Sequence, residues 1–246
     1  MMGRPLVLET LVLASKEKET MKNSESSLGI KKITILMLIA SLLMGSYLGV
    51  KGFFSAFHQV AGLENGWNLI LVNQDIYIPD DYNIELTVLS NGERVDSRIY
   101  PDLQDMFDHA RKDGVYPVVG AGFRTHKKQQ TLFDQKIEAY RAEGYSKAES
   151  RKLTKEAVAL PDTSEHQLGL AVDINADQSK STNDEVYDWL AQNAYHYGFI
   201  LRYPPDKTDI TGTVYEPWHY RYVGKGAARE IYTQKVCLEE YIEGLD

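Results

Sequence analysis

The alternation of apolar and polar residues after residue 66 predicts strands separated by turns and helices. The apolar run WNLILVN, residues 67–73, has the length and composition of a buried strand. The stretches 84–90 and 93–99 flank Asn91-Gly92, a dipeptide typical of a two-residue hairpin turn. The run VYPVVGAGF, residues 115–123, predicts a further strand.

Between and after these strands, apolar residues recur at helical spacing. One helix is predicted to begin at Pro101-Asp102 and to stop at Gly114, and Ser146 with Glu149 matches the capping box that starts another. The helix that starts at this capping box is predicted to cover residues 146–160, and the others cover residues 129–143, 183–197 and 225–241. Because hairpins and helices do not alternate regularly, the sequence indicates an α+β fold with a mainly antiparallel central sheet flanked by helices.

The stretch SEHQLGLAVDIN, from Ser164 to Asn175, predicts the central strand. One face of this strand carries apolar residues that we expect in the core, namely Leu168, Leu170, Val172 and Ile174. The other face carries small residues and Asp173, which leaves space for a metal ion and a substrate. His166 lies at an odd spacing from Asp173, so it must approach from the loop that enters the strand. A surface strand beside a loop histidine would give the same pattern.

The composition is that of an ordinary globular protein. The chain has 246 residues, 43% of them hydrophobic and 25% charged, which suits one sizeable domain with appendages. Its net charge of −8 and the absence of a long basic run argue against nucleic acid as a partner. Cys237 is the single cysteine, so Cys-rich zinc fingers are excluded and any zinc must be held by histidine and carboxylate.

Residues 33–50 form an 18-residue stretch without charge, at the lower limit for spanning a bilayer. Lys31 and Lys32 precede it, so the positive-inside rule predicts a cytoplasmic segment 1–32, a transmembrane anchor 33–50, a tether 51–66 and an extracytoplasmic domain 67–246. A cleaved signal peptide and a buried core helix are the alternatives. Met21 followed by Lys22 would give a compact start to such a segment, so we expect translation to begin at Met21.

The second informative stretch is EPWHYRY, residues 216–222. Pro217 prevents Glu216 and His219 from sharing a helix interior, so a turn or bulge is expected to bring both to one site. His166, Asp173 and His219 together supply two imidazoles and one carboxylate, which leaves an open position on a catalytic zinc ion. Glu216 is then the free carboxylate that acts as general base, or alternatively a group that orients a ligand histidine.

Three further residues are candidates for contact with a substrate or its neighbourhood. Arg124, at the end of the 115–123 strand, could bind a substrate carboxylate or a developing oxyanion, although an arginine before a helix is usually a solvated surface group. Trp218 could wall the pocket, although a tryptophan is more often part of the core. His126 is notable only because it follows Arg124 closely.

SEHQLGLAVDIN followed by EPWHYRYVG resembles the VanY-type zinc D-alanyl-D-alanine carboxypeptidases, whose pattern is SxHxxGxAxD…ExxWH. The resemblance covers about residues 67–241, including the segment GFR…Q and the loop RYPPDK at 202–207. It implies the fold of the D-Ala-D-Ala metallopeptidases and Hedgehog-like domains, with Glu216 as the base. The implied zinc ligands are His166, Asp173 and His219. The residues implied to hold the terminal carboxylate of the substrate or to polarise the scissile carbonyl are Arg124, Gln129 and Ser164. The family often has Tyr-Arg-Ser where this chain has Phe123, Arg124 and Thr125.

The sequence features predict a membrane-anchored, extracytoplasmic zinc peptidase, and the resemblance implies that it is a carboxypeptidase that removes the C-terminal D-Ala from peptidoglycan precursor stem peptides. The resemblance further implies a contribution to glycopeptide (vancomycin) resistance. The alternatives are an L,D-carboxypeptidase for tetrapeptide stems, a dipeptidase for free D-Ala-D-Ala and a non-catalytic cell-wall-binding module. The dipeptidase is disfavoured because its substrate is cytoplasmic, whereas this domain is expected outside the membrane. The binding module is disfavoured because Glu216 and the complete set of expected zinc ligands are present.

Overall fold

The computed structural model describes residues 66–245. The predicted cytoplasmic segment, membrane anchor and start at Met21, and all but the last residue of the predicted tether, lie outside the described residues. Among residues 66–245, no helix is both long and apolar enough to cross a membrane.

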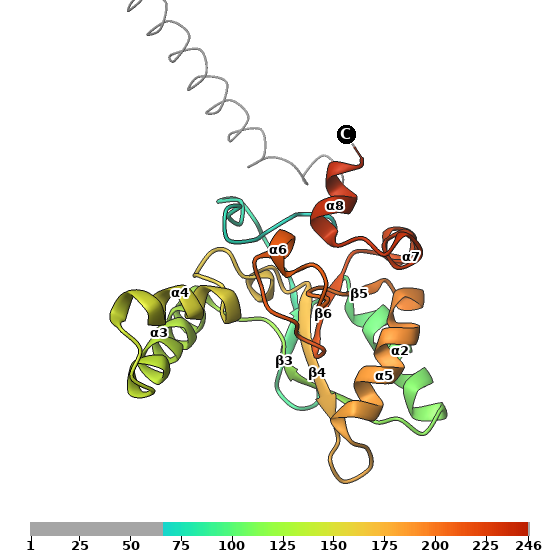
Figure 1. Ribbon diagram of the computed structural model, residues 1–246. Helices are drawn as coiled ribbons and strands as arrows, with labels where there is room; N and C mark the ends of the chain where they lie inside the picture. The colour runs from blue at the N-terminus through green and yellow to red at the C-terminus, as the bar shows by residue number, and fades with distance from the viewer. Residues whose placement is uncertain (1–65, 246) are drawn as a thin grey trace, which may run out of the picture. The chain divides into compact units, whose positions relative to one another are not determined.

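Two antiparallel sheets lie at the centre of the described part of the chain (Figure 1). The four-stranded sheet has the order β3-β4-β6-β5, and the two-stranded sheet is the hairpin β1-β2. The strands are β1 (Leu86–Val88), β2 (Arg94–Asp96), β3 (Pro117–Ala121), β4 (Ala171–Ala176), β5 (Phe199–Leu201) and β6 (His219–Tyr222). All of their pairings are antiparallel, so the predicted α+β class with an antiparallel central sheet is confirmed.

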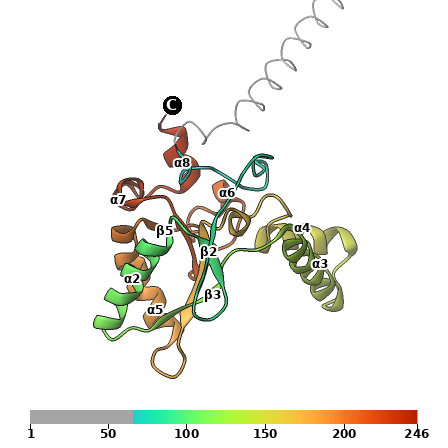
Figure 2. The ribbon, with the colours of Figure 1, turned by 180° about the vertical axis from the view of Figure 1, so that it is seen from behind.

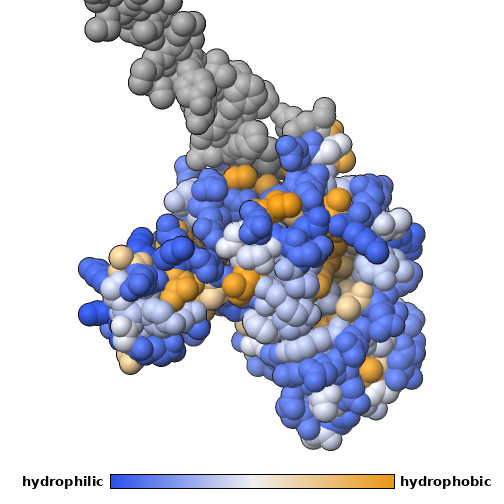
Figure 3. Space-filling model, viewed as in Figure 1, coloured by the Kyte–Doolittle hydropathy of each residue, from blue (hydrophilic) through white to orange (hydrophobic). Residues whose placement is uncertain are grey.

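Helices flank the four-stranded sheet on two sides. They are α2 (Tyr100–Lys112), α3 (His126–Ala142), α4 (Lys147–Ala157), α5 (Asn183–Asn193), α6 (Thr208–Thr211), α7 (Lys225–Gln234) and α8 (Leu238–Glu243), with 3₁₀ turns η1 (Glu165–Leu168) and η2 (Ala194–Tyr197). Helices α2 and α5 lie on one side, whereas α3 and α4 form a hairpin that extends away from the other side (Figures 1 and 2). The visible surface of this α3–α4 hairpin is mostly hydrophilic (Figure 3), as expected for an arm that contacts little else.

The core lies between the sheet and helices α2 and α5, as the alternation along residues 168–174 predicts. The four residues of that alternation are all fully buried: Leu168, Leu170, Val172 and Ile174. Residues from α2 and α5 belong to the same cluster, including Met106 and Leu190. The expected capping box of Ser146 and Glu149 is present at the start of α4.

The prediction of a strand at residues 67–73 is wrong, although the run is buried as expected. Two of its carbonyl groups bond to a side chain instead of a neighbouring strand. Nη2 of Arg221 lies 3.2 Å from the carbonyl oxygen of Asn68 and 2.8 Å from that of Ile70. The periodicity therefore indicates burial correctly, while the hydrogen-bond partner comes from a distant part of the chain.

The predicted hairpin at Asn91-Gly92 is present, but its loop is longer than two residues. The amide of Gly92 donates to the carbonyl of Leu89 at 2.9 Å, and the amide of Leu89 donates to the carbonyl of Glu93 at 2.7 Å. The loop thus contains the residues 90–92, with Gly92 in the left-handed region at φ 87°. A three-residue loop of this kind uses glycine at its last position because that position requires positive φ.

The single predicted helix at 225–241 is in fact two helices, α7 and α8. Lys235 adopts a left-handed conformation at φ 56° and ends α7. The backbone amide of Cys237 donates to Oε2 of Glu240 at 2.8 Å, which starts α8. Helical spacing of the apolar residues continues across this break, which is why the sequence suggests one element.

Candidate metal centre

Two histidines and one aspartate from three elements converge at the end of the central strands. His166 lies in η1, Asp173 in β4 and His219 in β6, and Asp173 and His219 are paired in register. Oδ1 of Asp173 lies 3.2 Å from Nε2 of His166 and 3.1 Å from Nδ1 of His219. One ligand atom from each of the three residues lies within 4.8 Å of the others.

The chain before β4 forms a turn that brings His166 to the side of Asp173. The predicted strand at 164–175 begins only at Ala171, because residues Glu165–Leu168 form the 3₁₀ turn η1. Gly169 ends this turn in the left-handed region at φ 69°, and a Cβ there would lie 3.0 Å from the backbone nitrogen of Asp96. Glycine is therefore required where the chain passes from the turn into the strand.

The ring of His166 is held in one orientation. Its Nδ1 lies 2.8 Å from the carbonyl oxygen of Gly122, so Nδ1–H donates and Nε2 is left as the acceptor that faces Asp173. Burial lowers the pKa of His166, which favours the neutral imidazole that a metal ligand requires.

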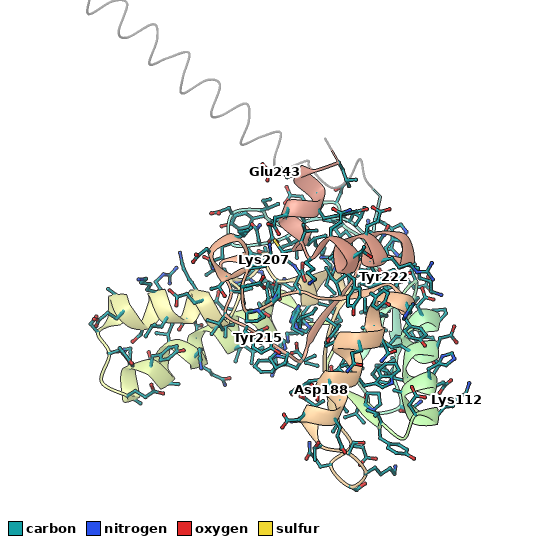
Figure 4. All side chains as sticks on the ribbon, turned by 45° about the vertical axis from the view of Figure 1, so that its right-hand side comes forward. Lys112, Asp188, Lys207, Tyr215, Tyr222 and Glu243 are labelled. Atoms are coloured by element: carbon teal, nitrogen blue, oxygen red, sulfur yellow. The ribbon has the colours of Figure 1, made fainter. Side chains whose placement is uncertain are left out.

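The turn expected from Pro217 is present before β6. The amide of His219 donates to the carbonyl of Glu216 at 3.1 Å, which closes the turn. Oε2 of Glu216 consequently lies 3.6 Å from Nδ1 of His219. Tyr215, on the loop that leads into this turn, lies between the α3–α4 hairpin and α5 (Figure 4).

A buried network behind His219 was not found by sequence reasoning. Oε2 of Glu165 lies 3.5 Å from Nε2 of His219, on the side of the ring opposite Asp173. Oε1 of Glu165 accepts from Arg202 at 2.7 Å and from Arg221 at 2.9 Å, and all three of these side chains are 0% exposed. Glu239 of α8 completes the network through two bonds to Arg202, of 2.8 and 2.6 Å. Two carboxylates and two guanidinium groups thus balance their charges in the interior.

The sequence gives only a weak signal for this network. Glu165 stands next to His166, and Arg202 begins the RYPPDK loop. A carboxylate beside a loop histidine looks like any surface residue until the two arginines are known to surround it.

The electrostatics of the site follow from burial and from these pairings. Burial alone would raise the pKa of Glu165, but the charges of Arg202 and Arg221 outweigh it and lower that pKa. The pKa of Asp173 is likewise lowered, because its contacts with His166 and His219 together outweigh the effect of burial. Burial raises the pKa of Glu216 to about 7. A carboxylate with that pKa can both accept and release a proton near neutral pH.

Arg124 and His126 lie at the edge of the site. Nη2 of Arg124 lies 2.6 Å from Oδ2 of Asp173, so the guanidinium is in direct contact with the ligand set. Its backbone amide donates to the carbonyl of His166 at 3.1 Å. His126 instead forms an exposed pair with Asp162 at 2.9 Å.

The other predicted substrate-binding residues are less directly placed. Ser164 is buried immediately before η1. Gln129 is buried in the first turn of α3, where its Nε2 donates to the carbonyl of Ala159 at 2.7 Å and its Oε1 has no partner among the described residues. Trp218 is half-buried, and its carbonyl accepts from the amide of Ile174 at 2.8 Å. Within residues 66–245, neither Gln129 nor Trp218 bonds to the three ligand residues by a side chain.

The three converging residues, His166, Asp173 and His219, fit a zinc ion. Ligand atoms about 2.1 Å from a common tetrahedral zinc lie about 3.4 Å apart. The separations of 3.2 and 3.1 Å at Asp173 Oδ1 are close to that value. Nε2 of His166 and Nε2 of His219 are both buried without a hydrogen-bond partner among the described residues, and the first of them faces Asp173.

Comparison with known proteins identifies the family. Residues 92–225 match the family described as VanY, D-alanyl-D-alanine carboxypeptidase. This chain is a member of the VanY family. A D-alanyl-D-alanine carboxypeptidase of Enterococcus faecalis is 60% identical over 181 residues, which cover 74% of this chain and 68% of that protein. The expectation of a VanY-type metallo-carboxypeptidase is therefore confirmed.

Solved VanY structures share the fold. VanYB in complex with D-alanine-D-alanine has a TM-score of 0.71 and 60% identity, and the match covers 72% of this chain and 98% of VanYB. A variant of the vancomycin-resistance D,D-pentapeptidase VanY, solved with Zn(II), has the same TM-score and identity and is covered to 99%. The zinc expected from the sequence agrees with the metal found in that VanY structure.

Proposed function

We propose that this protein is a zinc-dependent D,D-carboxypeptidase that hydrolyses the C-terminal D-Ala from peptidoglycan precursor stem peptides ending in D-Ala-D-Ala. The observation that carries the proposal is the convergence of His166, Asp173 and His219, with Glu216 beside them. Family membership and the VanYB complex with D-alanine-D-alanine support the class of substrate.

In this proposal His166, Asp173 and His219 would hold the zinc ion, with Nε2 of His166, Oδ1 of Asp173 and Nδ1 of His219 facing one another. When bound, zinc supplies Lewis-acid chemistry that polarises a carbonyl group and acidifies water. Oε2 of Glu165 lies 3.5 Å behind Nε2 of His219, and its negative charge would favour a proton on that nitrogen, which leaves Nδ1 toward the site. The carbonyl of Gly122 does the same for His166 from the other ring nitrogen.

Glu216 moves the proton. Its carboxylate accepts a proton from the attacking water and later gives it to the amine of the departing D-alanine. Arg124 has further N–H donors besides the one that meets Asp173, and these are assigned to the terminal carboxylate of the substrate. Ser164 and Gln129 are assigned to the same end of the substrate, Gln129 through the amide N–H that does not bond to Ala159, and Trp218 is assigned to the wall of the pocket.

The cellular setting is part of the same proposal. An anchor at residues 33–50 would place the catalytic domain outside the membrane, where lipid-linked and nascent stem peptides are exposed. Removal of the terminal D-Ala destroys the ligand of glycopeptide antibiotics. A role in vancomycin resistance is supported by the resistance cassette from which the 60% identical VanY comes.

The test measures D-alanine released by the zinc-loaded, full-length protein. Three substrates are compared: acyl-L-Lys-D-Ala-D-Ala, free D-Ala-D-Ala and acyl-L-Lys-D-Ala. Release from the first alone, abolished by a chelator and restored by zinc, is the expected result. Release only from acyl-L-Lys-D-Ala would make the protein an L,D-carboxypeptidase, and release only from the free dipeptide would make it a dipeptidase. No release, with zinc bound, would indicate a non-catalytic wall-binding module.

A further inference from the structure

The β1–β2 hairpin is joined to the segment that leads from β3 into the metal centre. Oε2 of Glu93 accepts from the amide of Gly122 at 2.8 Å. The carbonyl of Arg94 accepts from the amide of Phe123 at 2.5 Å. The guanidinium of Arg94 also lies over the ring of Phe123, 5.2 Å from its centroid. Figure 2 shows β2 beside β3 in this region.

The peptide group between Gly122 and Phe123 links this hairpin to His166. A trans peptide is planar, with its N–H and C=O pointing in opposite directions. On one side the N–H of this peptide donates to Arg94, and on the other side its C=O accepts from Nδ1 of His166 at 2.8 Å. The hairpin therefore fixes the direction of the carbonyl that orients the histidine ring.

The approach of the two backbones is close enough to require glycine. A Cβ at Gly122 would lie 2.2 Å from the carbonyl oxygen of Arg94, well inside any tolerated contact. Because Gly122 has no side chain to restrict its backbone rotation, its hydrogen bonds help to hold its conformation. The carboxylate of Glu93 supplies the bond on the preceding peptide group.

We propose that Glu93 is a positioning residue of the metal centre, which acts through Gly122 to hold His166 in its ligand orientation. The proposal rests on the proposed function, because it takes His166 as a zinc ligand. Glu93 touches neither the ligand residues nor the substrate-binding residues named above. Its effect is therefore expected on zinc affinity more than on the chemical step.

Asn91 offers a matched control on the same loop. Its Nδ2 donates to the carbonyl of Val119 at 2.7 Å, so it joins the hairpin to β3 as Glu93 does. That bond lies three residues before Gly122 and is not part of the connection to His166. A variant at Asn91 should weaken the attachment of the hairpin and leave the orientation of His166 unchanged.

The experiment measures zinc affinity by competition with a chromophoric chelator, using the full-length protein. Glu93→Ala should weaken zinc binding about tenfold, the lower end of the range for groups that orient a metal ligand. Glu93→Gln keeps an oxygen acceptor for the amide of Gly122 and should restore affinity close to that of the unmodified protein. Asn91→Ala should lower the Tm to a similar extent as Glu93→Ala while leaving zinc affinity unchanged.

Three outcomes would overturn the inference. If Glu93→Ala binds zinc as tightly as Asn91→Ala does, Glu93 only stabilises the hairpin. If Glu93→Gln is as weak as Glu93→Ala, the hydrogen bond to Gly122 is not the cause. His166→Ala serves as the reference. If His166→Ala loses zinc while Glu93→Ala binds it normally, this inference alone is refuted. If His166→Ala binds zinc undiminished, the proposed metal centre is refuted and this inference with it.

Discussion

Glu165 and His219 face each other in the interior, with Oε2 of the carboxylate 3.5 Å from Nε2 of the imidazole. The other ring nitrogen of His219, Nδ1, faces Asp173 and Glu216, so the two nitrogens of this ring have different surroundings. The inner side faces a buried network whose two carboxylates and two guanidinium groups balance in charge, and the outer side faces the proposed metal position. A carboxylate behind a ligand histidine fixes its tautomer and raises its basicity.

Glu165→Gln should therefore weaken zinc binding by about 10–100-fold, as expected for a partner of a ligand histidine. It should also lower the free energy of unfolding by about 3–5 kcal/mol, because Arg202 and Arg221 lose the charge that they share. Zinc competition and urea unfolding measure the two effects. Glu149→Gln, at an exposed capping residue of α4, is the control for loss of a carboxylate. Unchanged zinc affinity in Glu165→Gln would show that His219 is oriented without it.

Glu216→Ala should keep zinc binding but lose about 10²–10⁴-fold in kcat, the range for removal of a general base. Glu216 lies beside His219 and is not one of the three converging ligands. The measurement is D-alanine release at saturating zinc, with zinc content determined on the same sample. A variant of near-normal kcat would assign the proton transfer to another group.

Zinc should stabilise the protein through the three converging residues. At zinc concentrations about 100 times Kd, a ligand specific for the folded state adds about 2.7 kcal/mol. For a domain of this size that corresponds to an increase in Tm of about 5–10 °C. Thermal unfolding with and without zinc should show this increase in the unmodified protein and in Glu216→Ala. The increase should be lost in His166→Ala, and its persistence there would remove His166 from the ligand set.

Glu239 provides a pH-dependent contribution to stability. Burial alone would raise its pKa, but the charge of Arg202 outweighs burial and lowers it. A carboxyl group with a lowered pKa stabilises the folded state above its unfolded pKa of about 4.3, and this contribution disappears as pH falls through the folded pKa. Glu239→Gln should therefore cost about 1.5–3 kcal/mol at pH 7, as for hydrogen bonds to a charged group.

Urea unfolding of Glu239→Gln and the unmodified protein between pH 7 and pH 3 tests this sign. The difference between them should be constant above about pH 5 and should shrink at lower pH. Glu243→Gln, at the exposed end of α8 (Figure 4), should show no comparable difference at any of these pH values. A difference for Glu239→Gln that stays the same down to pH 3 would mean that its charge is not what stabilises α8.

The sequence was sufficient for those parts of the fold that depend on local pattern. Alternation from Leu168 to Ile174 predicts the buried face correctly, because a strand directs every second side chain to the same side. Pro217 predicts the turn that brings Glu216 next to His219, because proline excludes a helix interior there.

The parts that the sequence missed depend on contacts between distant residues. The run 67–73 is buried, but its hydrogen-bond partner is a side chain, and strand patterns assume a backbone partner. Glu165 has no local feature that separates it from a surface glutamate, since its burial depends on Arg202 and Arg221. The break between α7 and α8 depends on the left-handed conformation of Lys235, which a helical spacing of apolar residues does not reveal.

The contact of Arg221 with Asn68 and Ile70 also has a consequence for the order of folding during synthesis. Arg221 is 153 residues from Asn68 and 151 residues from Ile70 in sequence. The first described segment of the domain therefore receives these hydrogen bonds only from β6, near the end of the chain. A ribosome-bound chain that lacks β6 leaves those early carbonyls without their donor and the central sheet without its third strand. Closing a loop of this length costs conformational entropy before the contacts between its ends can stabilise the chain. The domain is therefore expected to fold as one unit after translation of residue 222, and nascent chains shorter than this should remain sensitive to protease.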